Sequence, residues 1–323
     1  MSTQPVPRFS TPAEFLQYVR SAYTIRQGHA TPDHKMLRLN RESLDTLGLP
    51  RPDPADPYGM VVRQLADQVT TGFRSRDGID VSESCAIGPL DHASVNARCF
   101  RSDEGHYAIV LHHGLMNLLH KHSKLLTAAV DPSRVVYCNR KDPSRLTRRE
   151  LVSWTEELGT IYRSTGETKG ALVKLNEEAT IAATTMLTLS EAFVLGHEIG
   201  HAVAGHLEDG SRLVADDEIP WLQFLPESSL HEDEFEADTH GFAAMRDPFE
   251  SVPKSMVLGA LVSTFSTLSL IGAGAASDTH PSAMDRIHHL VERHFNAETA
   301  KLVRRWIDEG DQQAATAALM TAR

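Results

Sequence analysis

Two histidines and a glutamate stand at a spacing that suits metal-assisted hydrolysis, in the run His197-Glu198-Ile199-Gly200-His201. On an α-helix, positions i and i+4 lie on one face about one turn apart, so His197 and His201 can bind one metal ion from the same side. Glu198 would then lie beside the open coordination position, where a carboxylate can take a proton from a water molecule. A five-residue pattern also arises by chance, so the surrounding residues must decide between the two explanations.

The residues around this run indicate a buried helix. Apolar side chains recur on both sides of the histidines, at Phe193, Val194, Leu195, Ile199, Ala202 and Val203. Burying two imidazoles and a carboxylate costs free energy unless another group pairs with them, and a metal ion would do so. The sequence therefore favours one Zn²⁺ per chain over a coincidental match.

A zinc hydrolase needs a third protein ligand and an open fourth position. One known spacing places a histidine at position 207, but Leu207 stands there. His206 points to another side of the helix, so we expect it at the helix end or behind a metal ligand.

A better source of the third ligand lies downstream, in Glu234-Phe235-Glu236-Ala237-Asp238. Glu234 and Asp238 share a helix face, so Glu234 can bind the metal while Asp238 accepts the outer N–H of a ligand histidine. Ala237 would let two helices approach closely, and Glu236 points to another face. The competing interpretation is a solvated acidic helix face, because the residues around Glu234 are rich in acidic side chains.

Two helices are predicted to carry these residues, at about 189–206 and 230–245. Each begins with a capping box, formed by Thr188 with Glu191 and by Ser229 with Glu232. A third apolar segment, 256–276, is about as long as a membrane span. It lacks an aromatic belt and contains many small and hydroxyl residues, so we predict a buried core helix and no membrane span.

Short β-like runs precede the first of these helices, at 79–87, 93–100 and 107–111. Gly105 lies between the last two, as in a hairpin. Helical patterns cover 58–73, 114–126 and most of 146–185, and two helical segments end the chain. The prediction is an α+β, helix-rich fold with a small β-sheet packed on the helix that carries His197.

Length, composition, charge and cysteine content limit the number of domains, the partners and the compartment that the sequence predicts. The 323 residues are 41% hydrophobic and 23% charged, an ordinary globular composition, and this length suits one large domain or two modest ones. The pattern along the chain predicts a peripheral, mostly helical region at 1–85 and a catalytic domain at 86–323, or one continuous domain. The formal net charge of -11 argues against a nucleic-acid partner. Three cysteines without a CxxC pair, and no apolar signal core in the first ten residues, predict a cytoplasmic protein without disulfides.

At these residues the chain resembles the HtpX and CAAX-prenyl-protease family of gluzincin metallopeptidases, which includes the Oma-type mitochondrial proteases. Four pieces match in order: Asn96-Ala97 with Gly114-Leu115, the run at 197–201 with His206, the Glu234–Asp238 pattern, and His280-Pro281 with Arg286-Ile287. The chain differs from the membrane-bound members in lacking clear transmembrane helices and in carrying a helical insertion at about 120–185. A looser similarity exists to soluble proteases of phage exclusion.

The resemblance implies that His197, His201 and Glu234 bind zinc, that Glu198 is the general base, and that Asp238 supports a ligand. It also implies that His280 and Arg286 lie near the site, where either is a candidate to stabilise the oxyanion. Arg286 has the alternative role of a salt-bridge brace, and His280 that of an ordinary loop residue.

The predicted function is a zinc-dependent metalloendopeptidase that acts on a protein or peptide. The substrate would add an extended strand at 93–100 or 107–111, beside an acidic segment at 207–228 that is either a lid or an ordinary loop. A zinc-binding scaffold without turnover and a zinc hydrolase of a non-peptide amide remain alternatives. A di-iron oxygenase would need a second ExxH unit, and Asp285 to His288 forms only DxxH.

Overall fold

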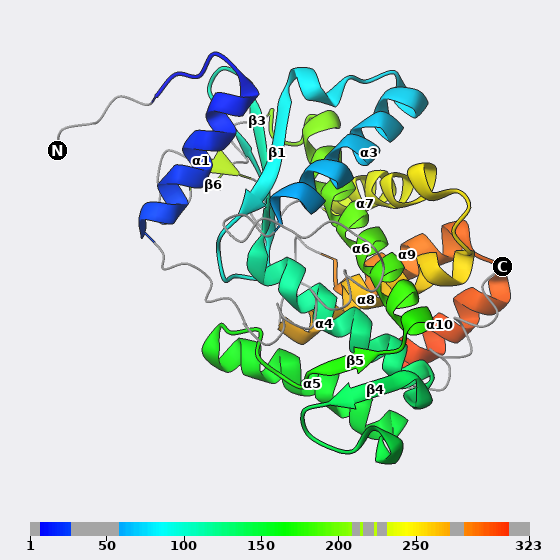
Figure 1. The fold of residues 1–323 in the computed structure, drawn as a ribbon. Helices are drawn as coiled ribbons and strands as arrows, with labels where there is room; N and C mark the ends of the chain where they lie inside the picture. Colours follow the sequence, from blue (N-terminus) through cyan, green and yellow to red (C-terminus); the bar gives the residue numbers. More distant parts are fainter. Residues whose placement is uncertain are drawn as a thin grey trace.

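Helices dominate the computed structural model, which describes residues 7–26, 58–208, 214–215, 223–224, 231–271 and 281–309. The helices are α1 (Pro12–Arg26), α3 (Gly59–Asp77), α4 (His113–Val130), α5 (Arg148–Thr165), α6 (Glu177–Val203), α7 (His231–Arg246), α8 (Lys254–Ile271), α9 (Ala283–His294) and α10 (Ala297–Glu309). The strands are β1 (Cys85–Leu90), β2 (Ala97–Arg101), β3 (Tyr107–His112), β4 (Val135–Cys138), β5 (Val173–Leu175), β6 (Val214–Ala215) and β7 (Gln223–Phe224). The predicted α+β, helix-rich class is confirmed (Figure 1).

The larger sheet has the strand order β1-β3-β2-β7-β6. Strands β2 and β3 form the predicted antiparallel hairpin, with Gly105 at a left-handed φ of 83° in the turn. Strand β1 pairs parallel to β3 on the other side, so β3 is a central strand. The prediction that 107–111 could serve as an edge for a peptide is therefore wrong, because both sides of β3 are hydrogen-bonded.

The two faces of this sheet pack on different helices. Cys99, Ile109 and Leu111 share a buried cluster with Leu195 and Ile199 of α6. The alternate side chains of the strands point the other way, because successive residues of a strand face opposite sides, and they meet α1. Figure 1 shows α1 on one side of β1 and β3, with α6 running through the middle of the molecule. The predicted packing of a small sheet on the helix that carries His197 is confirmed.

Helix α6 begins earlier than the sequence pattern predicted. Its N-cap is Asn176, whose side chain accepts a hydrogen bond from the backbone N–H of Ala179, and the helix runs for 27 residues. Thr188 and Glu191 lie inside it, so the capping box predicted there is wrong. A helix that has already begun leaves no free N–H groups at Thr188 to cap, and Glu191 is instead buried.

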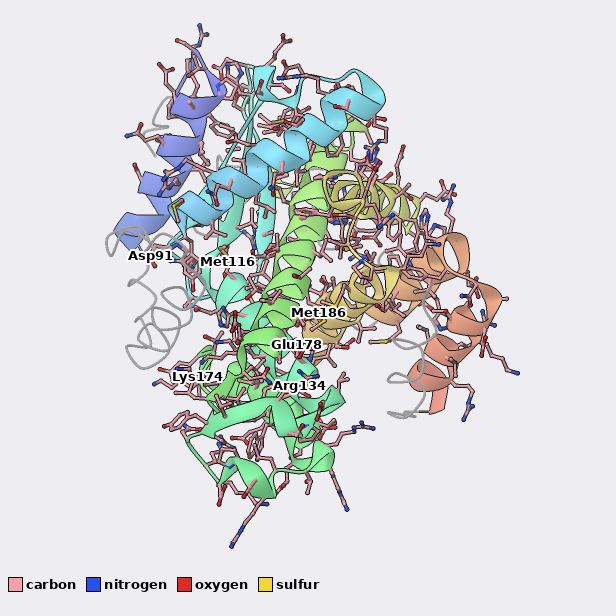
Figure 2. The ribbon with its side chains drawn as sticks, turned by 45° about the vertical axis from the view of Figure 1, so that its right-hand side comes forward. Asp91, Met116, Arg134, Lys174, Glu178 and Met186 are labelled. Carbon is pink, nitrogen blue, oxygen red and sulfur yellow. The ribbon has the colours of Figure 1, made fainter. Side chains whose placement is uncertain are left out.

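The region predicted as a helical insertion also contains strands. Strands β4 and β5 pair antiparallel and pack with α4, α5 and the first turns of α6. Arg134, just before β4, forms an ion pair with Glu178 at the start of α6, and Figure 2 labels both residues. The predicted domain boundary between residues 85 and 86 stays a prediction.

Helices α6 and α8 are long and apolar enough to cross a membrane by length and composition, and more than half of each qualifying window is buried inside the protein. In α8 the buried side chains include Leu258, Leu261 and Phe265, which pack in one cluster with α9. The absence of a membrane span stays a prediction. Cys85, Cys99 and Cys138 are buried free thiols, as the prediction of no disulfide requires.

Candidate metal centre

Glycines bring the two ligand-bearing helices to backbone contact. A Cβ at Gly196 of α6 would lie 2.2 Å from the Ala244 Cβ of α7, and one at Gly200 would lie 2.9 Å from the His240 Cβ and 3.1 Å from the Ala237 Cα. Real side chains do not approach so closely, so only glycine fits at these two positions. The close approach expected at Ala237 is confirmed, and it sets the distance between the histidines of α6 and the carboxylates of α7.

Three side chains converge where these helices meet. The Nε2 atoms of His197 and His201 are 3.1 Å apart. The Glu234 carboxylate lies 3.7 Å from the first of these nitrogens and 3.6 Å from the second. Ligand atoms at tetrahedral positions around one zinc ion are about 3.3 Å apart, so these three residues can hold a metal ion of that size.

The outer nitrogen of His197 has a buried partner. Its Nδ1 lies 3.1 Å from Asp238 Oδ1, and the Asp238 side chain has no exposed surface. The network assigns the proton to Nδ1, which donates to Asp238 and leaves the lone pair of Nε2 facing the cluster. Burial lowers the pKa of His197, but the hydrogen bond to Asp238 and the charges of Glu234 and Asp238 outweigh it, and the net shift is upward.

Arg286 of α9 clamps both carboxylates. Its Nε and Nη2 donate to Asp238 at 2.8 and 2.6 Å, and its Nη1 lies 3.2 Å from Glu234. Burial alone would raise the pKa of Asp238, yet the Arg286 charge and hydrogen bonds bring it below its usual value. Of the two roles weighed for Arg286, this geometry favours the brace.

His201 has a different support. Its Nδ1 lies 2.9 Å from the Nδ1 of His206, whose Nε2 is 3.2 Å from Glu236 Oε2 and 3.6 Å from Asp233 Oδ1. His206 is buried and stands behind His201, one of the two positions expected for it. No pattern in the sequence indicated Glu236 and Asp233 as its partners. Burial lowers the pKa of His201 well below its usual value, so its Nε2 keeps a free lone pair at neutral pH.

Glu198 is partly exposed, as is His197 before it, whereas Ile199 after it is buried. Burial of its carboxyl raises its pKa, and the charges of His197, Glu234 and Arg286 also act on it. It therefore lies close to the converging ligands without joining them, as a general base must.

Ser282 caps α9 in a capping box: its side chain accepts from the backbone N–H of Asp285, whose carboxylate accepts from the backbone N–H of Ser282. This fixes the first turn, from which Arg286 projects. His280, the capping residue Ser229 and most of the segment 207–228 lie outside the described residues.

The chemistry of the donor set fits a metal ion. Two imidazole lone pairs and a carboxylate face one point, while the outer nitrogens of both histidines are already hydrogen-bonded. Three acceptors at this distance repel one another unless a cation or a proton lies between them. Nitrogen and carboxylate ligands in this number are typical of a catalytic zinc site.

A family model described as peptidase U49 matches residues 141–306, which is just over half of the chain and includes both ligand-bearing helices. No curated protein and no solved structure matches the chain. The family supports hydrolysis of peptide bonds in general, and not membership of the HtpX, Oma or CAAX-protease family in particular. The chain belongs to the peptidase U49 family.

Proposed function

We propose that the protein is a zinc-dependent metalloendopeptidase of gluzincin type, with one zinc ion held by His197, His201 and Glu234. The observation that carries the proposal is the convergence of these three acceptors within 4.8 Å of one another. A zinc ion bound there would supply Lewis acidity, lowering the pKa of water and polarising a carbonyl group. The similarity to the HtpX-type proteases and a cytoplasmic location belong to the same proposal.

Glu198 supplies the proton transfers. In its ionised form it removes a proton from the attacking water molecule, and it then returns that proton to the leaving amine. The pKa of its carboxyl is raised by burial, which brings the acid closer to neutral pH and suits both transfers. Asp238 and Arg286 keep His197 and Glu234 in place through the reaction and do not exchange protons with the substrate.

The substrate would lie along β2. Phe100 and Arg101 of this strand pair with β7, and the proposed peptide would pair with the stretch 97–99 of the same strand. Cys99 of this stretch shares a buried cluster with Ile199, which neighbours Glu198 on α6. A peptide added antiparallel to this edge would pass beside the general base, with main-chain hydrogen bonds setting its register.

The test compares the wild type with Glu198→Gln, measuring the zinc content of each protein and its cleavage of a proteome-derived peptide library. We expect the variant to keep one zinc ion per chain and to lose cleavage by at least 100-fold, in the range typical of a lost general base. A zinc-loaded wild type that cleaves nothing would support a scaffold role instead. Equal cleavage by both proteins would refute the proposed role of Glu198.

A second pair of variants tests the ligand set. Glu234→Ala should lose the metal ion, because it removes one of three converging donors. Glu236→Ala is the matched control, since this side chain is 58% exposed and contacts only His206 among the site residues. Loss of the metal from the control alone would move the third ligand to Glu236.

A further inference from the structure

A buried acid lies on the same face of α6 as the proposed general base. Glu191 is 4% exposed and precedes Glu198 by seven residues, or two helical turns. The two side chains therefore point in nearly the same direction, about 10 Å apart along the helix axis. On either side of Glu191, Ser190 donates a hydrogen bond to α8 and Ala192 packs in the cluster shared with the sheet.

The surroundings of Glu191 come from the start of α3 and the first turns of α4. The negative charge of Glu191 contributes to the raised pKa of Tyr58, after burial of the phenol itself. The Tyr58 hydroxyl donates to Asn117 Oδ1 at 2.5 Å. The centroids of the Tyr58 and His113 rings are 4.6 Å apart. Met116, labelled in Figure 2, is buried in the same cluster as Ala192.

Among the described residues, no donor makes a hydrogen bond to the Glu191 carboxyl. The Tyr58 proton is used on Asn117, and no arginine or lysine of the described part forms an ion pair with Glu191. Burial accordingly raises the pKa of this carboxyl to about 8. A buried acid without a partner lowers stability, so its presence beside the reaction centre calls for a group that pairs with it.

A peptide lying along the edge of β2 can bring that group. An extended chain advances about 3.3 Å per residue, so the distance from Glu198 to Glu191 corresponds to about three substrate residues. A long side chain anchored one or two residues from the cleaved bond would span the rest. A cationic side chain pairs with a carboxylate and offers several donors, which an apolar or acidic side chain cannot do.

We propose that Glu191 is a specificity-determining residue that receives a lysine or arginine side chain of the peptide substrate near the cleaved bond. This inference rests on the proposed peptidase function. It explains why Glu191 lies on α6 among side chains that pack in the core and near the proposed general base. The residue holds the substrate and takes no part in the proton transfers made by Glu198.

The test uses the zinc-loaded full chain and a peptide library. We expect wild-type cleavage sites to carry lysine or arginine at one fixed position near the cleaved bond. For the best such peptide, replacing that lysine by acetyl-lysine should lower kcat/KM at least tenfold, mainly through KM. The wild type alone decides this comparison, so the outcome does not depend on whether a variant folds.

Variants then assign the effect to Glu191. Glu191→Gln should reduce the lysine-to-acetyl-lysine preference at least fivefold while keeping the zinc ion. Glu177→Gln, which changes an exposed acid on the same helix, should leave the preference unchanged. A wild type that cleaves without basic preference, or an unchanged preference in Glu191→Gln, would overturn the inference and leave the peptidase function standing. Absence of any wild-type cleavage would instead overturn the peptidase function.

Discussion

Removing Arg286 should destabilise the protein more than removing the acid it holds. Asp238 and Glu234 are both buried, with side chains 0% and 6% exposed, and Arg286 is the cation that contacts both. In metal-free protein, Arg286→Met removes the arginine that pairs with both buried carboxylates. Breaking a buried ion pair in this way typically costs about 3–5 kcal/mol in the free energy of unfolding.

Asp238→Asn should cost less, because the ion pair between Arg286 and Glu234 remains. The double variant Arg286→Met/Asp238→Asn should lose at least about 1 kcal/mol less than the sum of the single variants, since it removes a carboxylate that the lost arginine had compensated. Urea unfolding in the presence of a chelator measures all four proteins. Adding zinc should recover part of the loss in Arg286→Met, because the ion supplies the missing positive charge.

Two results would refute this reasoning. One is a cost below about 1 kcal/mol for Arg286→Met, which would mean that the carboxylates are protonated or solvated there. The other is strict additivity in the double variant, which would mean that Arg286 and Asp238 do not interact. The exposed pair Arg74–Asp80 provides a control, because breaking a surface ion pair should change stability far less than breaking the buried one.

The other expectations concern the supports of the site. His206→Ala should weaken zinc binding about 10- to 100-fold, measured by competition with a chelator, because a ligand histidine loses its outer partner; unchanged affinity would contradict this. Glu191 has a folded pKa of about 8 against a usual 4.5, so its contribution to stability is complete below pH 4.5 and is lost as pH rises through 8. The free energy of unfolding should therefore fall over that range by up to about 5 kcal/mol more in the wild type than in Glu191→Gln, and parallel pH profiles would exclude it. Gly196→Ala should cost about 1–3 kcal/mol through overlap with α7, whereas Gly72→Ala meets only ordinary contacts at 3.7 Å and should be neutral or stabilising; equal effects in thermal unfolding would argue against the helix contact.

The ligand residues of the candidate centre could be predicted from sequence because their spacing along each helix is local. His197 with His201, and Glu234 with Asp238, each occupy one face of a single helix, so periodicity alone aligns them. Their supports could not be predicted with the same certainty. Arg286 reaches Asp238 across 48 residues of chain, and only the docking of α9 on α7 decides between a brace and an oxyanion donor.

The errors in the fold have similar causes. A Thr-x-x-Glu pattern looks the same inside a helix as at its start, and the true cap at Asn176 is a single residue with no returning glutamate. Strands β4 and β5 have four and three residues, too short for a clear alternation of apolar side chains. The central position of β3 depends on the parallel pairing of β1, which lies beyond the reach of local patterns.

The glycine contact between α6 and α7 has a consequence for metal exchange. Because Gly196 and Gly200 fix the separation of the two helices by backbone contact, the spacing of the proposed metal ligands is set by the fold and not by an ion. A rigid cage of this kind accepts ions that share the radius and geometry of zinc. Cobalt(II) is such an ion, and its visible absorption reports the number of ligands directly. With cobalt bound, the proposed centre would offer a spectroscopic reporter of substrate entry that needs no dye and no labelled cysteine.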